Sequence, residues 1–422
     1  MDRGKIGRLL YRIVLGLTIG YYLAAGVLAF WTPRENNIDF SVCYVAGATA
    51  VRGSSPYNHG ELTKTRSELG GTVGTKPSYP FAYPPSVIPA CVLLSRLPWD
   101  AAQGLWKLLN TAFLIGAVLL TFWIFSELRF TTDQKYLAWS FAFIFSPSVS
   151  VLLVGQSSLL VLFTALLTMV MYHRRKTWSA GLSLALTLTK PHLTVPLVVF
   201  LLFRRQFRIA IIGLSMFAAL GIVGLYIGHS SVDTYLEGLH NYASSNRATN
   251  PRLVGIQNLT TIVFGTPASL TTLVSVFCGL LLLGLTLQID NRMSLRHRAE
   301  DALPLLLLVS VVAFGAHSYD LVLLIPLFIW SLGNANDDKR FVTIVILCFA
   351  LIVPLGAMKH VYEKVLSSFV PPSVYRFMLE PFRSWILLVL LALVMYLAFR
   401  ESVSRNAEML HVDQHQGEAS DA

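Results

Sequence analysis

Long apolar runs separated by short charged connectors restrict the folds open to this chain. From residue 102 to residue 228 such runs follow one another with only brief polar breaks. A strand of a membrane β-barrel would instead alternate apolar and polar residues over roughly 10 positions. Continuous apolar runs favour helices, which satisfy their own backbone hydrogen bonds in lipid. The sequence therefore predicts an all-α, polytopic membrane protein.

Counting the runs predicts about twelve transmembrane helices. They belong to a single domain, 1–400, followed by a polar cytoplasmic tail, 401–422. Only 13% of residues are charged, against about 25% in soluble domains, so the chain is poorly suited to an aqueous fold. The expected spans are 9–31, 102–127, 136–154, 157–173, 177–189, 192–203, 208–228, 267–288, 302–315, 319–332, 340–357 and 383–399.

Positive charge indicates how these spans are oriented. Lysine and arginine concentrate in alternate connectors, for example Arg174-Arg175-Lys176 and Arg204-Arg205, and cytoplasmic loops of membrane proteins collect such residues. The net charge of +10 is therefore explained by topology, and we expect no nucleic-acid partner. We predict a multi-pass protein of a bacterial plasma (inner) membrane, with membrane lipids around it and both termini in the cytoplasm.

The first outer loop, 32–101, is long and carries a helical pattern at its start. Apolar residues on one helical face of Asp39–Val51 predict a surface helix lying along the bilayer; they are Phe40, Tyr44, Gly47, Ala48 and Val51. Cys43 and Cys91 belong to the same loop and could share an oxidising compartment, so a disulfide between them is an open alternative that the sequence favours only weakly. Cys278 and Cys348 lie inside apolar runs and are expected to be packing residues.

Polar and ionisable residues converge on the outer face in this topology. They are Asp39, Gln156, Lys190, His192, Arg247, Arg252, Gln257, Asn258, His317, Asp320, Lys359 and His360. Ionisable groups at membrane depth are costly and mark functional sites by default. The convergence predicts an active site that faces outward. The sequence has no zinc spacing, P-loop or dinucleotide fingerprint, so we expect no metal and no cofactor.

Several motifs follow one another in an order that belongs to a known family. They are Asp39-Phe40 through Tyr44-Val45-Ala46-Gly47, Gly53-Ser54-Ser55-Pro56-Tyr57, Tyr83-Pro84-Pro85 with Trp106 behind it, Gly155-Gln156-Ser157-Ser158, Lys190-Pro191-His192, Gln257-Asn258-Leu259, and His317-Ser318-Tyr319-Asp320. With this order and spacing, from about residue 35 to residue 330, the chain resembles glycosyltransferase family 87, a group of GT-C type membrane enzymes.

The resemblance implies an inverting glycosyltransferase that uses a polyprenyl-phosphate sugar donor, with mannose as the expected sugar. The acceptor is a lipid or glycan on the outer face. An acidic residue in the first outer loop of such enzymes acts as general base, which implies that role for Asp39. The leaving phosphate needs cations or N–H donors. The expected donor-phosphate and substrate-binding residues are Lys190, His192, His317, Gln156, Tyr44 and Arg252.

Structural roles compete with these assignments. Asp39 is also a favoured residue for capping the helix after it. Lys190 and His192 are also suited to an interface position, where a long side chain reaches toward water. His317 and Gln156 fit a satisfied structural role at a turn. For the whole protein, the alternative is a membrane transporter or lipid flippase without glycosyl-transfer activity, and a third alternative is an inactive scaffold of the same fold.

Overall fold

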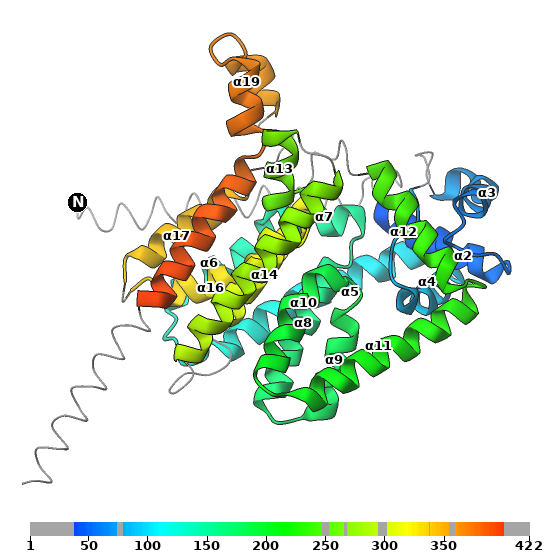
Figure 1. Ribbon diagram of the computed structural model, residues 1–422, viewed down its shortest axis with the longest axis horizontal. Helices are drawn as coiled ribbons and strands as arrows, with labels where there is room; N and C mark the ends of the chain where they lie inside the picture. The colour runs from blue at the N-terminus through cyan, green and yellow to red at the C-terminus, as the bar shows by residue number, and fades with distance from the viewer. Residues whose placement is uncertain are drawn as a thin grey trace, which may run out of the picture.

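The computed structural model describes residues 38–73, 79–246, 253–265, 268–293, 302–336, 338–353 and 359–400. Over these ranges every regular element is helical (Figure 1), and the extended backbone forms one isolated bridge, between Leu253 and His317. The predicted all-α class is confirmed. The expected first span, 9–31, and the tail, 401–422, lie outside the described residues.

The α-helices are short and numerous. They are α2 (Ile38–Val51), α3 (His59–Leu69), α4 (Ile88–Ser95), α5 (Trp99–Ile124), α6 (Thr132–Ile144), α7 (Ser146–Val154), α8 (Ser158–His173), α9 (Thr177–Thr187), α10 (Pro191–Phe203), α11 (Phe207–Ile227), α12 (Val232–Asn246), α13 (Ile256–Phe264), α14 (Ala268–Met293), α15 (Leu303–Ala313), α16 (Ile325–Asn334), α17 (Arg340–Ala350) and α19 (Pro372–Val374), with a last helix over 382–400. Tighter or wider turns form η2 (Gly70–Val73), η3 (Pro85–Val87), η5 (Ser318–Leu324), η6 (Tyr362–Leu366) and η7 (Tyr375–Leu379).

The structure supports a membrane protein but does not confirm about twelve spans. Among the described residues, four helices are long and apolar enough to cross a bilayer; they are Trp99–Ile124, Phe207–Ile227, Leu270–Asn291 and Pro372–Arg400. The pair α6 and α7, bent by 41°, would make a fifth. Other predicted spans correspond to shorter helices, such as α9 and α10 with 11 and 13 residues. A straight span needs about 20.

Local sequence explains where the apolar runs are interrupted. The expected span 136–154 divides at Phe145, because Pro147 lacks the N–H that one continuous helix would need to bond to the Phe143 carbonyl, and it is instead accommodated in the first turn of α7. Arg175 and Arg205 take left-handed backbone in the basic connectors after α8 and α10. The apolar run 136–154, which the sequence predicts as one span, is therefore divided into α6 and α7.

The described residues form two hydrophobic cores. The larger one joins α5 to α10 with α14 to α17 and the last helix, and Phe141 stacks on Phe328 near its middle with ring centroids 3.7 Å apart. The second core belongs to the first outer loop, where α2, α3, α4 and the start of α5 pack around Phe40, Leu62 and Trp99. Figure 1 shows α2, α3, α4 and α12 gathered at one end of the molecule.

The helix predicted for Asp39–Val51 exists as α2, but it does not lie on a surface. Residues around its whole circumference are buried, including Phe40, Val42, Val45 and Ala50. One face of α2 carries small residues, which allow close packing against neighbours. At Gly47 an added Cβ would collide with the backbone carbonyl of Cys91, so α4 lies directly on this face.

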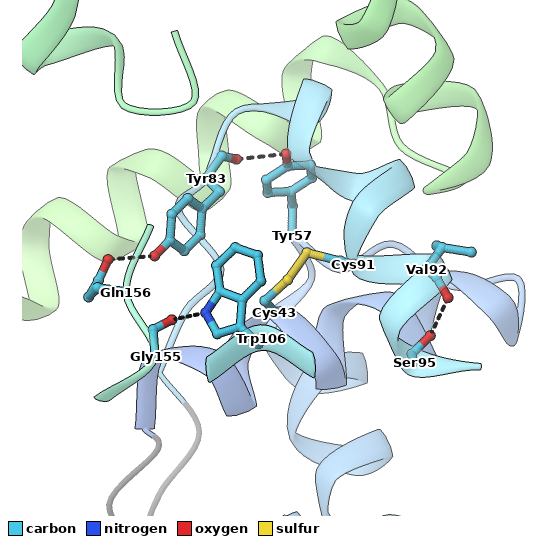
Figure 2. Close-up of a disulfide and its surroundings, with 9 residues drawn as sticks. All are labelled: Cys43, Tyr57, Tyr83, Cys91, Val92, Ser95, Trp106, Gly155 and Gln156. Carbon is cyan, nitrogen blue, oxygen red and sulfur yellow. Dashed lines mark hydrogen bonds between the residues drawn. A yellow bond between two sulfur atoms is a disulfide. The ribbon is translucent and has the colours of Figure 1, made fainter. Parts of the chain in front are cut away.

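A disulfide joins α2 to α4, which the sequence left open. Cys43 and Cys91 are bonded with their Cα atoms 5.2 Å apart, next to Trp106 and Tyr83 (Figure 2). The bond closes a sequence separation of 48 residues. Cys278 and Cys348 stay unbonded, and Cys348 is buried as the sequence predicted. The described part of the segment 38–101 is therefore a cross-linked unit with its own core.

Removal of this bond should destabilise the protein. Closing a loop of this length restricts the unfolded chain, so Cys43→Ser with Cys91→Ser should lower the free energy of unfolding by about 2–4 kcal/mol, measured by denaturation in detergent. Cys278→Ser is the matched control and should leave the free energy nearly unchanged. In denatured, unreduced wild-type protein only Cys278 and Cys348 should react with a maleimide, and labelling of all four cysteines would contradict the cross-link.

Candidate active site

A buried ion pair lies where three helices of the larger core end. The Lys190 Nζ atom is 2.7 Å from Asp320 Oδ1 and donates a second hydrogen bond to Ser158 Oγ at 2.8 Å. Ser158 Oγ donates to the same Asp320 oxygen at 2.6 Å. Lys190 is 6% exposed and Asp320 is fully buried. Charges taken out of water are tolerated only when paired and hydrogen-bonded in this way.

Lys190 and Ser158 both lie where a helix begins. Lys190 precedes Pro191, the first residue of α10, and proline forces extended backbone on the residue before it. Thr194 Oγ1 stabilises the break by donating to the carbonyls of Thr187 and Lys190, at 2.8 and 3.0 Å. Ser158 is the first residue of α8. The α9–α10 hairpin therefore brings its ammonium group to the start of α8.

Asp320 also fixes the position of His317. Its second oxygen, Oδ2, accepts a hydrogen bond from the His317 backbone N–H at 2.9 Å. The His317 ring stacks parallel on Tyr319 with centroids 5.1 Å apart, and the Lys190 ammonium group lies 4.7 Å from the centroid of the same Tyr319 ring. The ion pair, the histidine and the tyrosine thus form one connected network.

The first outer loop meets this network at the turn between α7 and α8. Gly155 ends α7 in left-handed backbone, and its carbonyl accepts from the Trp106 indole at 2.8 Å. The next residue, Gln156, accepts at Oε1 from the Tyr83 hydroxyl at 2.9 Å (Figure 2). Phe40 of α2 packs against Gly155 so closely that an added Cβ would collide with it. This turn is therefore held in place by three residues of the second core, Phe40, Tyr83 and Trp106.

Asp39 is held at the same place because it precedes Phe40 in the first turn of α2. Burial and then the negative charge of Asp39 raise the pKa of Tyr83 well above its ordinary value, so the carboxylate lies close to that phenol. Asp39 remains half-buried, as do Tyr83 and His317. A carboxylate with partial access to solvent can exchange a proton with a bound molecule.

His192 completes the accessible part of the cluster. It follows Lys190 by two residues, and the charges of Asp320, Lys190 and His317 all act on it. Its side chain is exposed by area, and the surrounding protein partly desolvates it. Asp39, Tyr83, His192 and His317 are the accessible groups around the buried ion pair.

The structure brings together most of the predicted site residues, namely Asp39, Gln156, Lys190, His192 and His317. Tyr44 lies apart in the second core, where its hydroxyl donates to the Leu97 carbonyl at 2.9 Å and its ring meets the Trp99 ring edge-on at 5.1 Å. Arg252 lies outside the described residues, as does Arg247.

Sequence reasoning did not select Ser158, Tyr83 or Tyr319 as site residues, and it noted Asp320 only as an outer polar residue. One signal was available for Asp320. A lysine inside an apolar chain needs a counter-ion at membrane depth, and acidic residues are scarce in the apolar runs. Tyr83 and Tyr319 stand in the motifs Tyr83-Pro84-Pro85 and His317-Ser318-Tyr319-Asp320, but their contacts depend on tertiary packing, which the motifs do not show.

Over the ranges that the structure describes, no group of three or more histidine, cysteine, aspartate or glutamate side chains is arranged to hold a metal ion. The model of glycosyltransferase family 87 matches residues 81–354, well over half of the chain. The matched region contains every residue of the buried network and excludes Asp39. No match to a curated protein was found.

The ion pair predicts a large coupling energy. Lys190→Met or Asp320→Leu alone leaves an uncompensated buried charge and should cost about 3–5 kcal/mol of unfolding free energy. The double variant should cost clearly less than the sum, as measured by a double-mutant cycle in detergent. The exposed pair Arg52–Glu68 is the control, with an expected coupling below about 1 kcal/mol. Simple additivity at residues 190 and 320 would contradict the pairing.

Proposed function

Because the chain belongs to glycosyltransferase family 87, we propose that it transfers a sugar from a polyprenyl-phosphate donor to a lipid or glycan acceptor. Mannose is the proposed sugar, and the outer face of the membrane is the proposed place of the reaction. The family and the apolar helices together make the protein a membrane glycosyltransferase. The observation that carries the finer proposal is the accessible carboxylate of Asp39, which lies close to Tyr83 and to Tyr319, the ring that Lys190 and His317 contact.

In the proposed reaction, Asp39 accepts the proton of an acceptor hydroxyl. The acceptor oxygen then forms a bond to the anomeric carbon of the donor sugar. The bond from that carbon to the phosphate oxygen breaks, and its electron pair leaves with polyprenyl phosphate. Attack and departure occur on opposite faces of the carbon, so the configuration inverts. The half-buried position of Asp39 suits a general base, since it admits substrate and limits competition from bulk water.

The leaving phosphate gains negative charge, and the proposal assigns its stabilisation to His192 and His317. An imidazole offers an N–H donor in either protonation state, and donors aimed at a developing charge lower the barrier. Lys190 has a different part. Its ammonium group is already engaged by Asp320, Ser158 and the Tyr319 ring, so it fixes the ring on which His317 stacks. Gln156 orients Tyr83 through its hydrogen bond.

Two observations support an outward-facing site in a bacterial inner membrane with cytoplasmic termini. Structural disulfides persist in oxidising compartments, and the Cys43–Cys91 bond lies in the unit that carries Asp39. The basic connectors after α8 and α10 fit the opposite, cytoplasmic side. The family match gives no support to the alternative of a transporter or lipid flippase.

Replacement of the base tests the mechanism. Asp39→Asn keeps the shape and removes proton acceptance, so sugar transfer from radiolabelled polyprenyl-phosphate mannose to membrane lipid or glycan extracts should fall about 10²- to 10⁴-fold. Asp233→Asn, an exposed aspartate in the first turn of α12, should transfer at the wild-type rate. Equal transfer by the wild type and Asp39→Asn would remove Asp39 from the role of base. Labelled solute or lipid crossing vesicles without any transfer would favour the transporter.

Cysteine accessibility tests the orientation. Thr63 on α3 and Lys176 in the basic connector are both exposed. In a chain with Cys278→Ser and Cys348→Ser, Thr63→Cys should react with a maleimide that cannot cross the inner membrane. The reaction is carried out on cells whose outer membrane has been permeabilised and whose inner membrane is intact. Lys176→Cys should react only after lysis. The reverse pattern would place the site on the cytoplasmic side and contradict the proposal.

A further inference from the structure

We propose that Tyr83, Tyr319 and Tyr242 form the subsite for the donor's sugar ring and recognise its hydroxyl groups. The inference rests on the proposed function, because it takes the donor to be a lipid-linked sugar. The three tyrosines are neither the proposed base nor the proposed phosphate ligands. The three phenols come from three distant segments, the first outer loop, η5 and α12.

Tyr83 is held rigidly at both ends. Its backbone carbonyl accepts from the Tyr57 hydroxyl at 2.9 Å, and its own hydroxyl donates to Gln156 (Figure 2). Pro85, two residues later, lies directly on α11, where a Cβ at Gly224 would collide with the Pro85 carbonyl. The phenol proton is given to Gln156, so the oxygen offers its lone pairs as acceptors, and the Ser157 hydroxyl is near enough to use one of them. The half-buried ring can reach a bound molecule.

Tyr319 lies between the two proposed reacting ends of the site. His317 stacks on its ring and Lys190 lies over it, so its orientation is fixed by the proposed phosphate-binding side. Tyr319 is 9% exposed, and it is close enough to the Asp39 carboxylate and the Tyr83 phenol for both to influence its pKa. In an inverting displacement the sugar must lie between base and phosphate, because nucleophile and leaving group occupy opposite faces of one carbon. Tyr319 therefore borders the position that a sugar ring would take.

Tyr242 covers the same position from α12. Gly238 lets α12 pack onto Tyr57, and the rings of Tyr235 and Tyr57 meet edge-on at 5.1 Å. Tyr242 follows Tyr235 by seven residues, which is two helical turns, so both occupy one face of α12. Half-buried Tyr242 interacts electrostatically with both Tyr83 and Tyr319. Three phenols thus surround one place beside Asp39.

Phenols suit a sugar for two reasons. Their rings offer apolar faces to the C–H groups of a pyranose, and their hydroxyls both donate and accept hydrogen bonds. Recognition of a sugar hydroxyl by fixed polar groups discriminates strongly against an analogue that lacks it, since the protein group is then left unpaired. The tyrosines would thereby select among lipid-linked sugars.

Binding and transfer together test this subsite. The probes are short-chain polyprenyl-phosphate mannose and the methyl diester of the same polyprenyl phosphate, which carries the same charge and no sugar. Wild-type protein in detergent should bind the mannose form more tightly. Tyr83→Phe, Tyr242→Phe and Tyr319→Phe should each reduce that preference about threefold to tenfold, as expected for one hydrogen bond, and should leave binding of the methyl diester unchanged. Tyr226→Phe, an exposed phenol on α11, is the control and should behave as wild type.

The outcomes separate this inference from the proposed function. A wild-type protein without any preference for the mannose form, or phenylalanine variants that keep the full preference, would overturn the subsite. If the preference exists and the variants lose it, but wild type transfers no sugar to any acceptor extract, the subsite stands and the proposed reaction fails. Transfer by wild type with unchanged kcat/KM in all three variants would retain the reaction and reject the subsite.

Discussion

The ion pair between Lys190 and Asp320 is the constraint on which the arrangement of the larger core depends. Removing each charge from water costs several kcal/mol, and the attraction offsets this only if the remaining hydrogen-bonding groups are also satisfied. Ser158 and the His317 backbone N–H supply them, so segments separated by 130 and 162 residues must meet at one point. Irregular backbone is tolerated inside a membrane protein where protein surrounds it or where it lines a cavity. The break before Pro191 and the 3-10 turns of η5 fit this rule, and they explain why α9, α10 and α15 are too short to span a bilayer.

The carboxylate of Asp39 reaches this network from a different core. The first outer loop packs around its own aromatic cluster, and the Cys43–Cys91 bond and the contact at Gly47 fix α2 within it. Its connection to the larger core runs through the turn at Gly155 and Gln156, which Phe40, Trp106 and Tyr83 contact (Figure 2). The relative position of base and histidines is therefore set by how two separately stabilised units meet. A site at such a junction is open to substrate while its groups remain individually rigid.

The sequence predicted the helical class and much of the cluster, because apolar runs and basic connectors assign residues to a membrane side without any tertiary information. Asp39, Gln156, Lys190, His192 and His317 were gathered in this way. It did not predict the number of spans, since a short buried helix such as α15 is as apolar as a helix that crosses lipid. The burial of α2, the disulfide and the hydroxyl contact of Tyr44 all depend on packing between segments. The partnership of Lys190 with Asp320 is likewise a tertiary fact, and periodicity carries no sign of it.

On the proposed function, the pairing of Lys190 has a consequence for catalysis. An unpaired lysine would already bind the donor phosphate strongly before the reaction, and attraction that is present in the bound donor does not lower the barrier. Paired with Asp320, the ammonium contributes little net charge to the resting site. The phosphodiester of a polyprenyl-phosphate sugar carries about one negative charge, and the leaving phosphate gains a second as the bond to the sugar breaks. Imidazole N–H groups at His192 and His317, oriented by the neutral pair beneath them, interact more strongly with the second charge than with the first. The buried pair would then favour the transition state over the bound donor, and its main contribution would be orientation.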